Sequence, residues 1–232
     1  MRSKIGQLLW IANQTRPDLS FGVSNLAVKL NNATISDIIS LNKVVRKAKS
    51  NDFDLTFCSV GKNEKLICFT DAAFGNLPDG GSQGSYLIFL VGENGICSLL
   101  SWQSKRLKRV VRSSLAAESL AMSDCVDAAI FIASMYKSIM YGDQCSKCIP
   151  IEIVTDNRSL HDALYSKKFV TEKRLRIDIA AVKESLINGN ISKITWVNAN
   201  KQLADCLTKE GAPSYKLIEV LQANKINNYS ED

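Results

Sequence analysis

Residues 65–104 read KLICFTDAAFGNLPDGGSQGSYLIFLVGENGICSLLSWQS, and they carry the strongest strand signals in the chain. Three apolar runs in it predict β-strands, because they are rich in β-branched and aromatic residues and are separated by turn signals. These runs are 65–71, 85–92 and 96–104. The last two flank Glu93-Asn94-Gly95, where the Asn-Gly pair is a strong signal for a hairpin. The stretch therefore predicts antiparallel strands that begin a sheet.

The chain after this hairpin alternates between helical and strand-like patterning. A long helix is predicted from about Ser113 to Met140, with Ser113 or Ser114 as its N-cap. Two further strands are predicted, IEIVTD at 151–156 and ISKITWVN at 191–198. Shorter helices are predicted at 157–166, 172–188 and 202–209. Antiparallel strands followed by β-α-β crossovers predict an α/β fold, a five-stranded mixed sheet with helices on its faces.

Residues 1–50 predict helices and contain no strand signal. Pro17 suits the first turn of a second helix, and Thr34 with Asp37 resembles the capping box that begins a third. Residues 51–62 are expected to connect this helical segment to the sheet. The residues after Pro213 have a weak helical pattern and a polar end, and they are expected to form a tail.

Composition narrows the class of protein. A chain of 232 residues has room for one good-sized domain and an appendage. No apolar run approaches the roughly 20 residues that span a bilayer, and the N-terminus does not resemble a signal peptide. We therefore expect a soluble, intracellular protein without membrane contacts; the sequence does not distinguish cytoplasm from nucleus or fix the oligomeric state. The seven cysteines, an odd number, predict reduced thiols, although Cys145 and Cys148 form one C-x-x-C motif.

The net charge of +6 is compatible with a polyanionic partner. Basic residues crowd two predicted loops, one before the long helix and one before the helix at 172–188. The first group is Lys105, Arg106, Lys108, Arg109 and Arg112. The second group is Lys167, Lys168, Lys173, Arg174 and Arg176. Each group is either an ordinary solvated surface or part of a nucleic-acid interface.

Four carboxylates stand where local packing alone would not place them. Asp71 and Asp156 each end a predicted strand, and if those strands are parallel neighbours both acids emerge at the same edge of the sheet. Glu118 falls on the apolar stripe of the long helix, and Asp205 on the short helix at 202–209. A buried salt bridge could explain Glu118, and a turn or a helix cap could explain one aspartate. All four together predict a cation site.

Carboxylates without a cluster of histidines or cysteines favour Mg²⁺ or Mn²⁺ over zinc. Two such ions, about 3.5–4 Å apart, are suited to phosphodiester hydrolysis. Other chemistries fit less well, because the chain has no phosphate-binding glycine loop and a Ser–His–Asp triad would need His161, the single histidine. His161 is expected to be an ordinary surface residue.

The motifs around these acids resemble the ribonuclease H region of copia-type LTR retrotransposon Pol polyproteins. They are FTDAAFGNLPDGGSQGSYLIFL, LSWQSKRLKRVVRSSLAAESLAM, IVTDNRSL and NANKQLADCLTK. Upstream, RSKIGQLLWIANQTRPDLSFGVSNLA resembles the segment that closes the family's reverse transcriptase. The resemblance covers about residues 2–212. It implies a helical segment at 1–62, a ribonuclease H-like domain at 63–212 and a tail at 213–232.

The resemblance also implies a function. In the family, Asp71, Glu118, Asp156 and Asp205 correspond to the acids that bind two Mg²⁺ ions and cleave the RNA strand of RNA/DNA hybrids. The implied partners are the hybrid, read through its backbone and 2′-hydroxyls, and the rest of a reverse transcriptase. Candidate nucleic-acid-binding residues are Ser113, Asn157, Lys105, Arg106, Arg109 and Arg112.

The chain departs from the family pattern in two places. Arg176 stands where many members have the histidine of a K-H-I-D-I segment, and the short VNANKQLAD segment lacks the histidine loop of some ribonucleases H. The polymerase aspartates are absent, so no polymerase activity is expected. Two rival hypotheses are a truncated or host-adopted nucleic-acid-binding remnant that leaves its acids unused, and another enzyme of the same broad fold, such as an integrase. The integrase is disfavoured because such enzymes do not generally use a glutamate from the first long helix.

Overall fold

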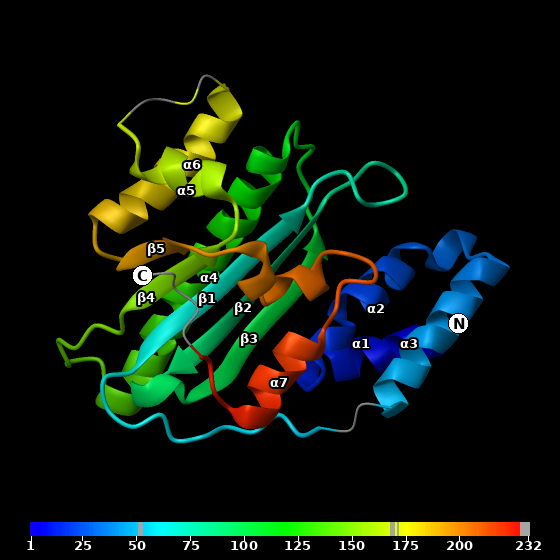
Figure 1. Cartoon of the computed structure of the whole chain (residues 1–232), viewed down its shortest axis with the longest axis horizontal. Helices are drawn as coiled ribbons and strands as arrows, with labels where there is room; N and C mark the ends of the chain where they lie inside the picture. The colour runs from blue at the N-terminus through cyan, green and yellow to red at the C-terminus, as the bar shows by residue number, and fades with distance from the viewer. Residues whose placement is uncertain (51–52, 168–169, 171, 228–232) are drawn as a thin grey trace.

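A five-stranded mixed sheet lies at the centre of the computed structural model, which describes residues 1–50, 53–167, 170 and 172–227 (Figure 1). The strand order is β3-β2-β1-β4-β5. The strands are β1 (Lys65–Ala73), β2 (Gln83–Val91), β3 (Cys97–Arg106), β4 (Ile151–Thr155) and β5 (Lys193–Trp196). β2 pairs antiparallel with β1 and β3, whereas β4 pairs parallel with β1 and β5. The predicted fold class is confirmed.

The predicted hairpin is also confirmed. β2 and β3 are joined by a short 3₁₀ turn, η3 (Glu93–Gly95). Asn94 and Gly95 have φ angles of 61° and 76°, the left-handed conformation that favours these two residue types. The Asn-Gly pair therefore predicted the turn correctly, because both residues adopt the positive φ angles that the turn requires.

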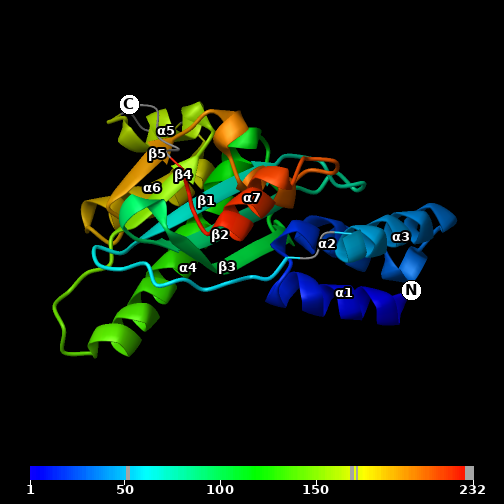
Figure 2. The same cartoon turned by 60° about the horizontal axis from the view of Figure 1, so that its bottom comes forward.

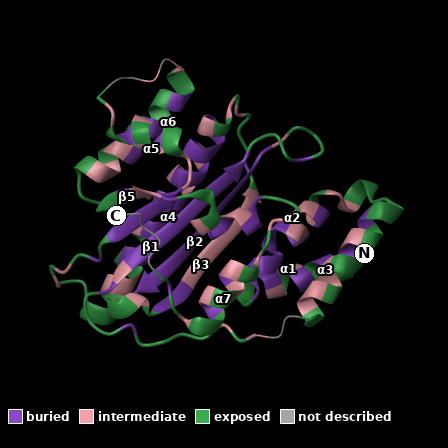
Figure 3. Cartoon of the chain, viewed as in Figure 1, coloured by how far each residue is buried: buried purple, intermediate pink, exposed green. Residues whose placement is uncertain are grey.

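Three helices cover one face of the sheet, and they are α4 (Ser114–Tyr141), α5 (Arg158–Tyr165) and α6 (Lys173–Ile187). Successive residues of β1 point to opposite faces, because side chains alternate along a strand. Leu66 and Cys68 face these helices, while Ile67 and Phe69 face the other side. As a result β1, β2 and β4 are almost entirely buried, whereas most of β3 and half of β5 are of intermediate exposure (Figure 3).

The opposite face is covered by the last part of the chain. A short 3₁₀ helix, η5 (Ala204–Leu207), and the helix α7 (Tyr215–Ala223) pack there (Figure 2). We expected a tail after Pro213, but Leu217 and Leu221 of α7 are buried against the sheet. These residues recur at helical spacing, and their contact with the sheet supplies the stability that the local pattern lacks. The expected polar end, residues 228–232, lies outside the described residues.

The N-terminal segment forms the helices α1 (Arg2–Gln14), α2 (Ser20–Val28) and α3 (Ile35–Ser50), with the short 3₁₀ helices η1 (Pro17–Leu19) and η2 (Leu30–Asn32). They share a small core of their own. The predicted capping box is present, because the Thr34 backbone N–H donates to Asp37 Oδ2 at 2.9 Å and the Asp37 N–H donates to Thr34 Oγ1 at 3.3 Å. Residues 53–60 then lead toward β1 without forming a helix or strand.

The helical segment lies beside β3, the strand at one edge of the sheet (Figure 1). The indole Nε1 of Trp102 in β3 donates a hydrogen bond of 2.8 Å to the carbonyl oxygen of Ala12 in α1. The helices thus cover a strand edge that would otherwise be open to pairing with another chain. Nowhere in the described part of the chain does a helix have the length and apolarity needed to cross a membrane.

Candidate metal centre

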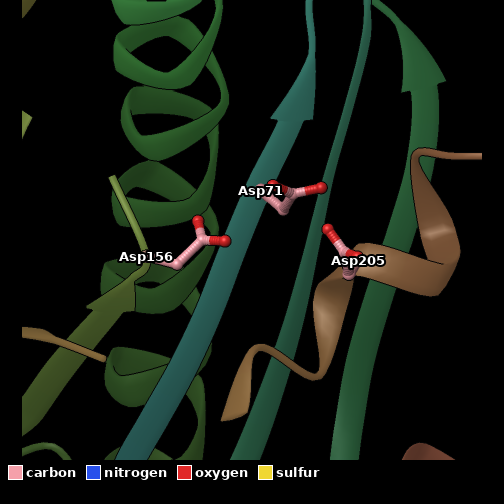
Figure 4. A group of neighbouring side chains, drawn as sticks. All are labelled: Asp71, Asp156 and Asp205. Atoms are coloured by element: carbon pink, nitrogen blue, oxygen red, sulfur yellow. The ribbon is translucent and has the colours of Figure 1, made fainter. Parts of the chain in front are cut away.

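Three aspartates meet at one edge of the sheet (Figure 4). Asp71 lies near the end of β1, and Asp156 directly follows β4, its parallel neighbour. Because the carboxyl ends of parallel strands share an edge, both side chains arrive at the same place, as the strand ends predicted. Asp205 reaches it from η5, and carboxylate oxygens of the three residues lie within 4.8 Å of one another. The structure thus brings together three of the four acids that the sequence singled out.

The turn that carries Asp205 is tied to the sheet by hydrogen bonds. Gln202 Nε2 donates to the carbonyl oxygen of Thr70 at 2.9 Å, and Ser85 Oγ donates to that of Ala204 at 3.2 Å. The hydroxyl of Thr208 donates to the carboxylate of Asp71. Residues before, within and after the turn are thus each bonded to β1 or β2, and these bonds fix where Asp205 points. We expected a short α-helix here; the structure has a single 3₁₀ turn.

Glu118 projects from the first part of α4. Its neighbours on the helix stripe, Met122, Cys125 and Ala129, are buried against the sheet as predicted, and Glu118 itself is only 6% exposed. Its Oε2 atom has no hydrogen-bond partner in the described part of the chain, and no salt bridge to Glu118 is found there. A buried carboxylate oxygen without a partner is costly. The salt-bridge explanation for Glu118 therefore has no support in the described residues.

The pKa values of these acids are raised, mainly by burial and to a smaller extent by the charges of neighbouring acids. Burial raises the pKa of Asp71 to about 6, against the opposing effects of Lys209 and Thr208. Burial, followed by the charges of Asp71 and Asp156, raises the pKa of Glu118 well above its usual value. Burial also raises the pKa of Asp156, although Lys209 opposes this shift. The carboxylates therefore hold their charge poorly unless a cation joins them.

Lys209 is the residue that the sequence analysis missed. Its ammonium group forms an ion pair with Asp205 and lies 3.9 Å from Asp71 Oδ2. Burial lowers the pKa of Lys209, but the carboxylates of Asp71 and Asp205 raise it, and the net shift of this pKa is upward. The spacing of Asp205 and Lys209, four residues apart, is the signal that could have found this pair.

The donor set fits a hard divalent cation. Three carboxylates converge, a fourth carboxylate nearby has a buried oxygen without a partner, and no histidine or cysteine belongs to the cluster in the described residues. Oxygen ligands of this kind suit Mg²⁺ or Mn²⁺ better than zinc. Such an ion would also favour the charged forms of these acids, whose pKa values are raised by burial and by mutual repulsion.

Two candidate nucleic-acid-binding residues serve as helix caps. Ser113 accepts a hydrogen bond from the Ala116 N–H at the start of α4, at 3.2 Å, and Asn157 accepts one from the Leu160 N–H at the start of α5, at 2.9 Å. Helix capping alone is enough to explain why Ser113 and Asn157 stand at these positions. It leaves their proposed contact with nucleic acid as a prediction.

Three residues of the first basic group form ion pairs within the protein. Lys105 pairs with Asp124 at 3.1 Å, and Arg106 pairs with Asp79. Arg109 Nη1 lies 3.2 Å from Asp178 Oδ1 of α6, whereas Arg112 is exposed. In the second group Lys167, Lys173, Arg174 and Arg176 are exposed, and Lys168 lies outside the described residues. Binding of nucleic acid by either group stays a prediction.

The two minor candidates show no sign of catalytic or metal-binding use. His161 lies on α5, where its ring is tilted against that of Tyr165 with 4.9 Å between the ring centroids, and it is not a member of the acid cluster. All seven cysteines are free, including Cys145 and Cys148. Neither of these two belongs to a metal-binding group in the part of the chain that the structure describes.

The chain is similar to transposon polyproteins, although no family model matches it. It is 29% identical over 210 residues to the Retrovirus-related Pol polyprotein from transposon RE2 of Arabidopsis thaliana, and 28% identical to that from transposon RE1. Each alignment covers 90% of this chain and 14% of the relative. The chain is also 30% identical over 132 residues to the Secreted RxLR effector protein 161 of Plasmopara viticola, covering 56% of this chain and 89% of that protein.

Among solved structures, the similar ones include two ribonucleases H. The LC11-RNase H1 in complex with an RNA/DNA hybrid is 19% identical, with a TM-score of 0.45, and the match covers 66% of this chain and 99% of that one. The RNase H1 of Halobacterium salinarum NRC-1 is 17% identical, with a TM-score of 0.41, over 60% of this chain and 89% of that one. The fold assignment rests on the strand order and not on these distant likenesses.

The order β3-β2-β1-β4-β5, with acids at the ends of the parallel strands β1 and β4, defines a protein of the ribonuclease H-like fold. The motifs around the acids resemble those of copia-type Pol polyproteins, and the two transposon relatives carry the same name, Retrovirus-related Pol polyprotein. The chain is similar over 90% of its length to the Pol polyproteins of two Arabidopsis transposons, and it spans about one-seventh of the length of these relatives, 14% in each case.

Proposed function

We propose that the chain is a ribonuclease H that uses divalent cations, Mg²⁺ or Mn²⁺, to cleave the RNA strand of RNA/DNA hybrids. The observation that carries the proposal is the meeting of Asp71, Asp156 and Asp205 at the carboxyl edge of the sheet, beside a buried Glu118 whose Oε2 has no partner in the described residues. A cluster that repels itself in this way is suited to holding cations and has no evident structural use.

Each acid would have a separate task in that chemistry. Two bound ions would supply a hydroxide nucleophile from water and neutralise the departing oxygen of the phosphodiester. Asp71 is the most buried of the three aspartates, 1% exposed, and would anchor the site from β1. Asp156 and Asp205 are more open to solvent and would face the substrate, while Glu118 would hold a ligand position from α4.

The proposal extends to the organisation of the chain. We assign residues 63–212 to the ribonuclease H-like domain and residues 1–62 to the end of a reverse transcriptase. The rest of that enzyme would be a partner that helps to hold the hybrid, and the hybrid itself would be read through its backbone and 2′-hydroxyls. Residues 213–227 also contribute to the sheet packing through Leu217 and Leu221, so a domain prepared for experiments should retain them.

The test is cleavage of a labelled RNA/DNA hybrid with Mg²⁺, comparing wild type with Asp71→Asn and Glu118→Gln. Each substitution should lower cleavage by more than roughly 100-fold, the upper end of what losing an outer-shell partner of a metal costs. Asp127→Asn is the matched control, because Asp127 is exposed on the same helix as Glu118 and should cleave like wild type.

Two results would contradict the proposal. One is cleavage that survives either Asp71→Asn or Glu118→Gln, and the other is cleavage that persists when divalent ions are chelated. If wild type binds the hybrid but never cuts it, the chain is the non-catalytic binding remnant instead.

A further inference from the structure

A groove runs between the N-terminal helices and the acid-bearing side of the sheet. It consists of three adjoining hollows, the largest of about 250 Å³, which lies between α2 and α3 on one side and residues 206–212 on the other. The second hollow shares Phe21, Asn25 and Lys29 with the first. The third continues along α2 past Pro78 to Arg106. Because all three share Asn25 and Lys29, they form one continuous surface.

Lysines dominate the charge of the largest hollow. Four of them line it, and they are Lys29, Lys43, Lys47 and Lys209. Among the described residues only two acids line the same hollow, and one of these, Asp18, is already held by Arg16 at 2.8 Å and 2.9 Å. Like charges gathered around one hollow repel, so an anionic ligand would be favoured there.

Lys43 illustrates most clearly the excess of positive charge around this hollow. It is exposed on α3, and it has no hydrogen bond or ion pair within the described residues. Lys29 is bound by Asp37 at 3.1 Å, and Lys47 donates to the carbonyl oxygen of Asp18 at 2.7 Å. An exposed lysine has three donors to offer, and those of Lys43 are available to a ligand.

One residue joins the groove to the acid cluster. Lys209 lines the first and second hollows, and its Nζ atom lies 3.9 Å from Asp71 Oδ2. Lys209 and the three residues after it line the first hollow opposite α2 and α3. A chain of phosphates lying in the groove would therefore lead to the carboxylates.

We infer that this groove binds the sugar-phosphate backbone of one nucleic-acid strand and guides it to the acid cluster. The proposed function supplies the identity of that nucleic acid, an RNA/DNA hybrid, and the inference rests on it in this respect. Lys43 and Lys29 would contact phosphates, and Asn25 would offer its side-chain amide to the same strand. The helical segment would then be a working part of the substrate-binding surface as well as a cover for β3.

The experiment measures binding by fluorescence anisotropy with a short labelled RNA/DNA hybrid. It is done in the Asp71→Asn background, so that Mg²⁺ can be present without cleavage. Lys43→Glu is compared with Lys62→Glu, which makes the same charge change at an exposed lysine just before β1, at the end of that strand opposite Asp71. Lys43→Gln removes the charge without reversing it, and it replaces Lys43→Glu if that variant does not fold. Duplex DNA and single-stranded RNA are run alongside as probes of strand type.

Lys43→Glu should weaken hybrid binding several-fold and lower the slope of log K against log salt by about one, the signature of one lost phosphate contact. Lys62→Glu should bind like the parent. Equal affinities and slopes for the parent and both Lys43 variants would overturn the inference, as would an equal loss in Lys62→Glu. A parent that does not bind hybrid at all would overturn it too. Wild-type chain that fails to cleave while Lys43 still governs binding would refute only the proposed function.

Discussion

Lys209 and Asp205 form an ion pair across one turn of chain, and the same ammonium group lies 3.9 Å from Asp71 Oδ2. The protein thus places a cation of its own against two of the carboxylates that would bind a divalent ion. The ammonium and the ion would compete for the same oxygens, since both are drawn by the same negative charge. Without the ion, Lys209 and the hydroxyl of Thr208 both favour the charged form of Asp71.

Lys209→Met should therefore destabilise the metal-free protein at neutral pH and increase the stabilisation that Mg²⁺ provides. We expect a loss of about 1 kcal/mol or less, because the lysine side chain is 45% exposed and solvent screens it. Thermal unfolding with and without Mg²⁺ measures both effects. Lys209→Arg keeps the charge and should behave more like wild type. Identical unfolding of wild type and Lys209→Met under both conditions would contradict the prediction.

The metal-free protein should lose stability as the pH rises from about 4 to about 6. Burial raises the pKa of Asp71 to about 6 in the folded state, against an ordinary value of 3.8. In this window the folded state holds the proton more often than the unfolded state does, so unfolding becomes easier as the pH increases. The full effect is of the order of 2–3 kcal/mol above the window.

Denaturant unfolding across this pH range, in chelator, measures that loss. Asp71→Asn cannot titrate at this position and should show a flatter profile. Saturating Mg²⁺ at pH 7 should restore stability to wild type more than to Asp71→Asn. A wild-type profile that rises through pH 4–6 and matches that of Asp71→Asn would refute the prediction.

The capping box of α3 should be sensitive to acid in the opposite direction. Hydrogen bonds from the side chain and backbone of Thr34, together with Lys29, lower the pKa of Asp37 to about 2. A lowered pKa means that this contribution is fully present above the unfolded value near 4 and is lost as the pH falls through about 2. Amide exchange in α3 should therefore accelerate over that range.

Thr34→Ala removes the hydroxyl of the box and should cost about 1 kcal/mol, as expected for an N-cap. Amide exchange of α3 at neutral pH measures this cost. Thr34→Ser keeps a hydroxyl and serves as the control. If both variants protect α3 as wild type does, the hydrogen bonds of the box do not stabilise the helix.

The contact between Trp102 and Ala12 should hold the N-terminal helices against the sheet. Trp102→Phe keeps most of the apolar area but removes the 2.8 Å hydrogen bond, leaving the Ala12 carbonyl without its donor. We expect a loss of about 1 kcal/mol, seen as faster amide exchange in α1 than in β1. Trp10→Phe is the control, since Trp10 is 67% exposed. Equal exchange in α1 for both variants would show that this bond does not hold the helices.

Sequence patterns predicted the parts of the structure that depend on local periodicity. Two apolar runs separated by a helical pattern are enough to predict a pair of parallel strands. Because Asp71 and Asp156 stand at the ends of these runs, the pattern also predicted that both lie at one edge of the sheet. The apolar stripe of α4 likewise predicted that Glu118 is buried, because residues at helical spacing share one face. These inferences use only the directions of side chains along regular elements.

The remaining features depend on contacts between segments far apart in the sequence. The position of Asp205 is set by Gln202 and Thr208, which bond to β1 more than 130 residues earlier, and no local pattern encodes such bonds. The burial of α7 was missed because its short apolar stripe becomes informative only once the sheet face is present. The groove could not be predicted from the sequence either, since it exists only where the helical segment meets the sheet.

The bonds from residues 202–208 to β1 also have a consequence for synthesis. The sheet needs residues up to Trp196, but the cluster of acids is complete only when the turn at Asp205 has docked. A growing chain on the ribosome can therefore form its strands before it can chelate a cation tightly. An ion bound at the proposed site would therefore stabilise mainly those chains whose final turn has docked.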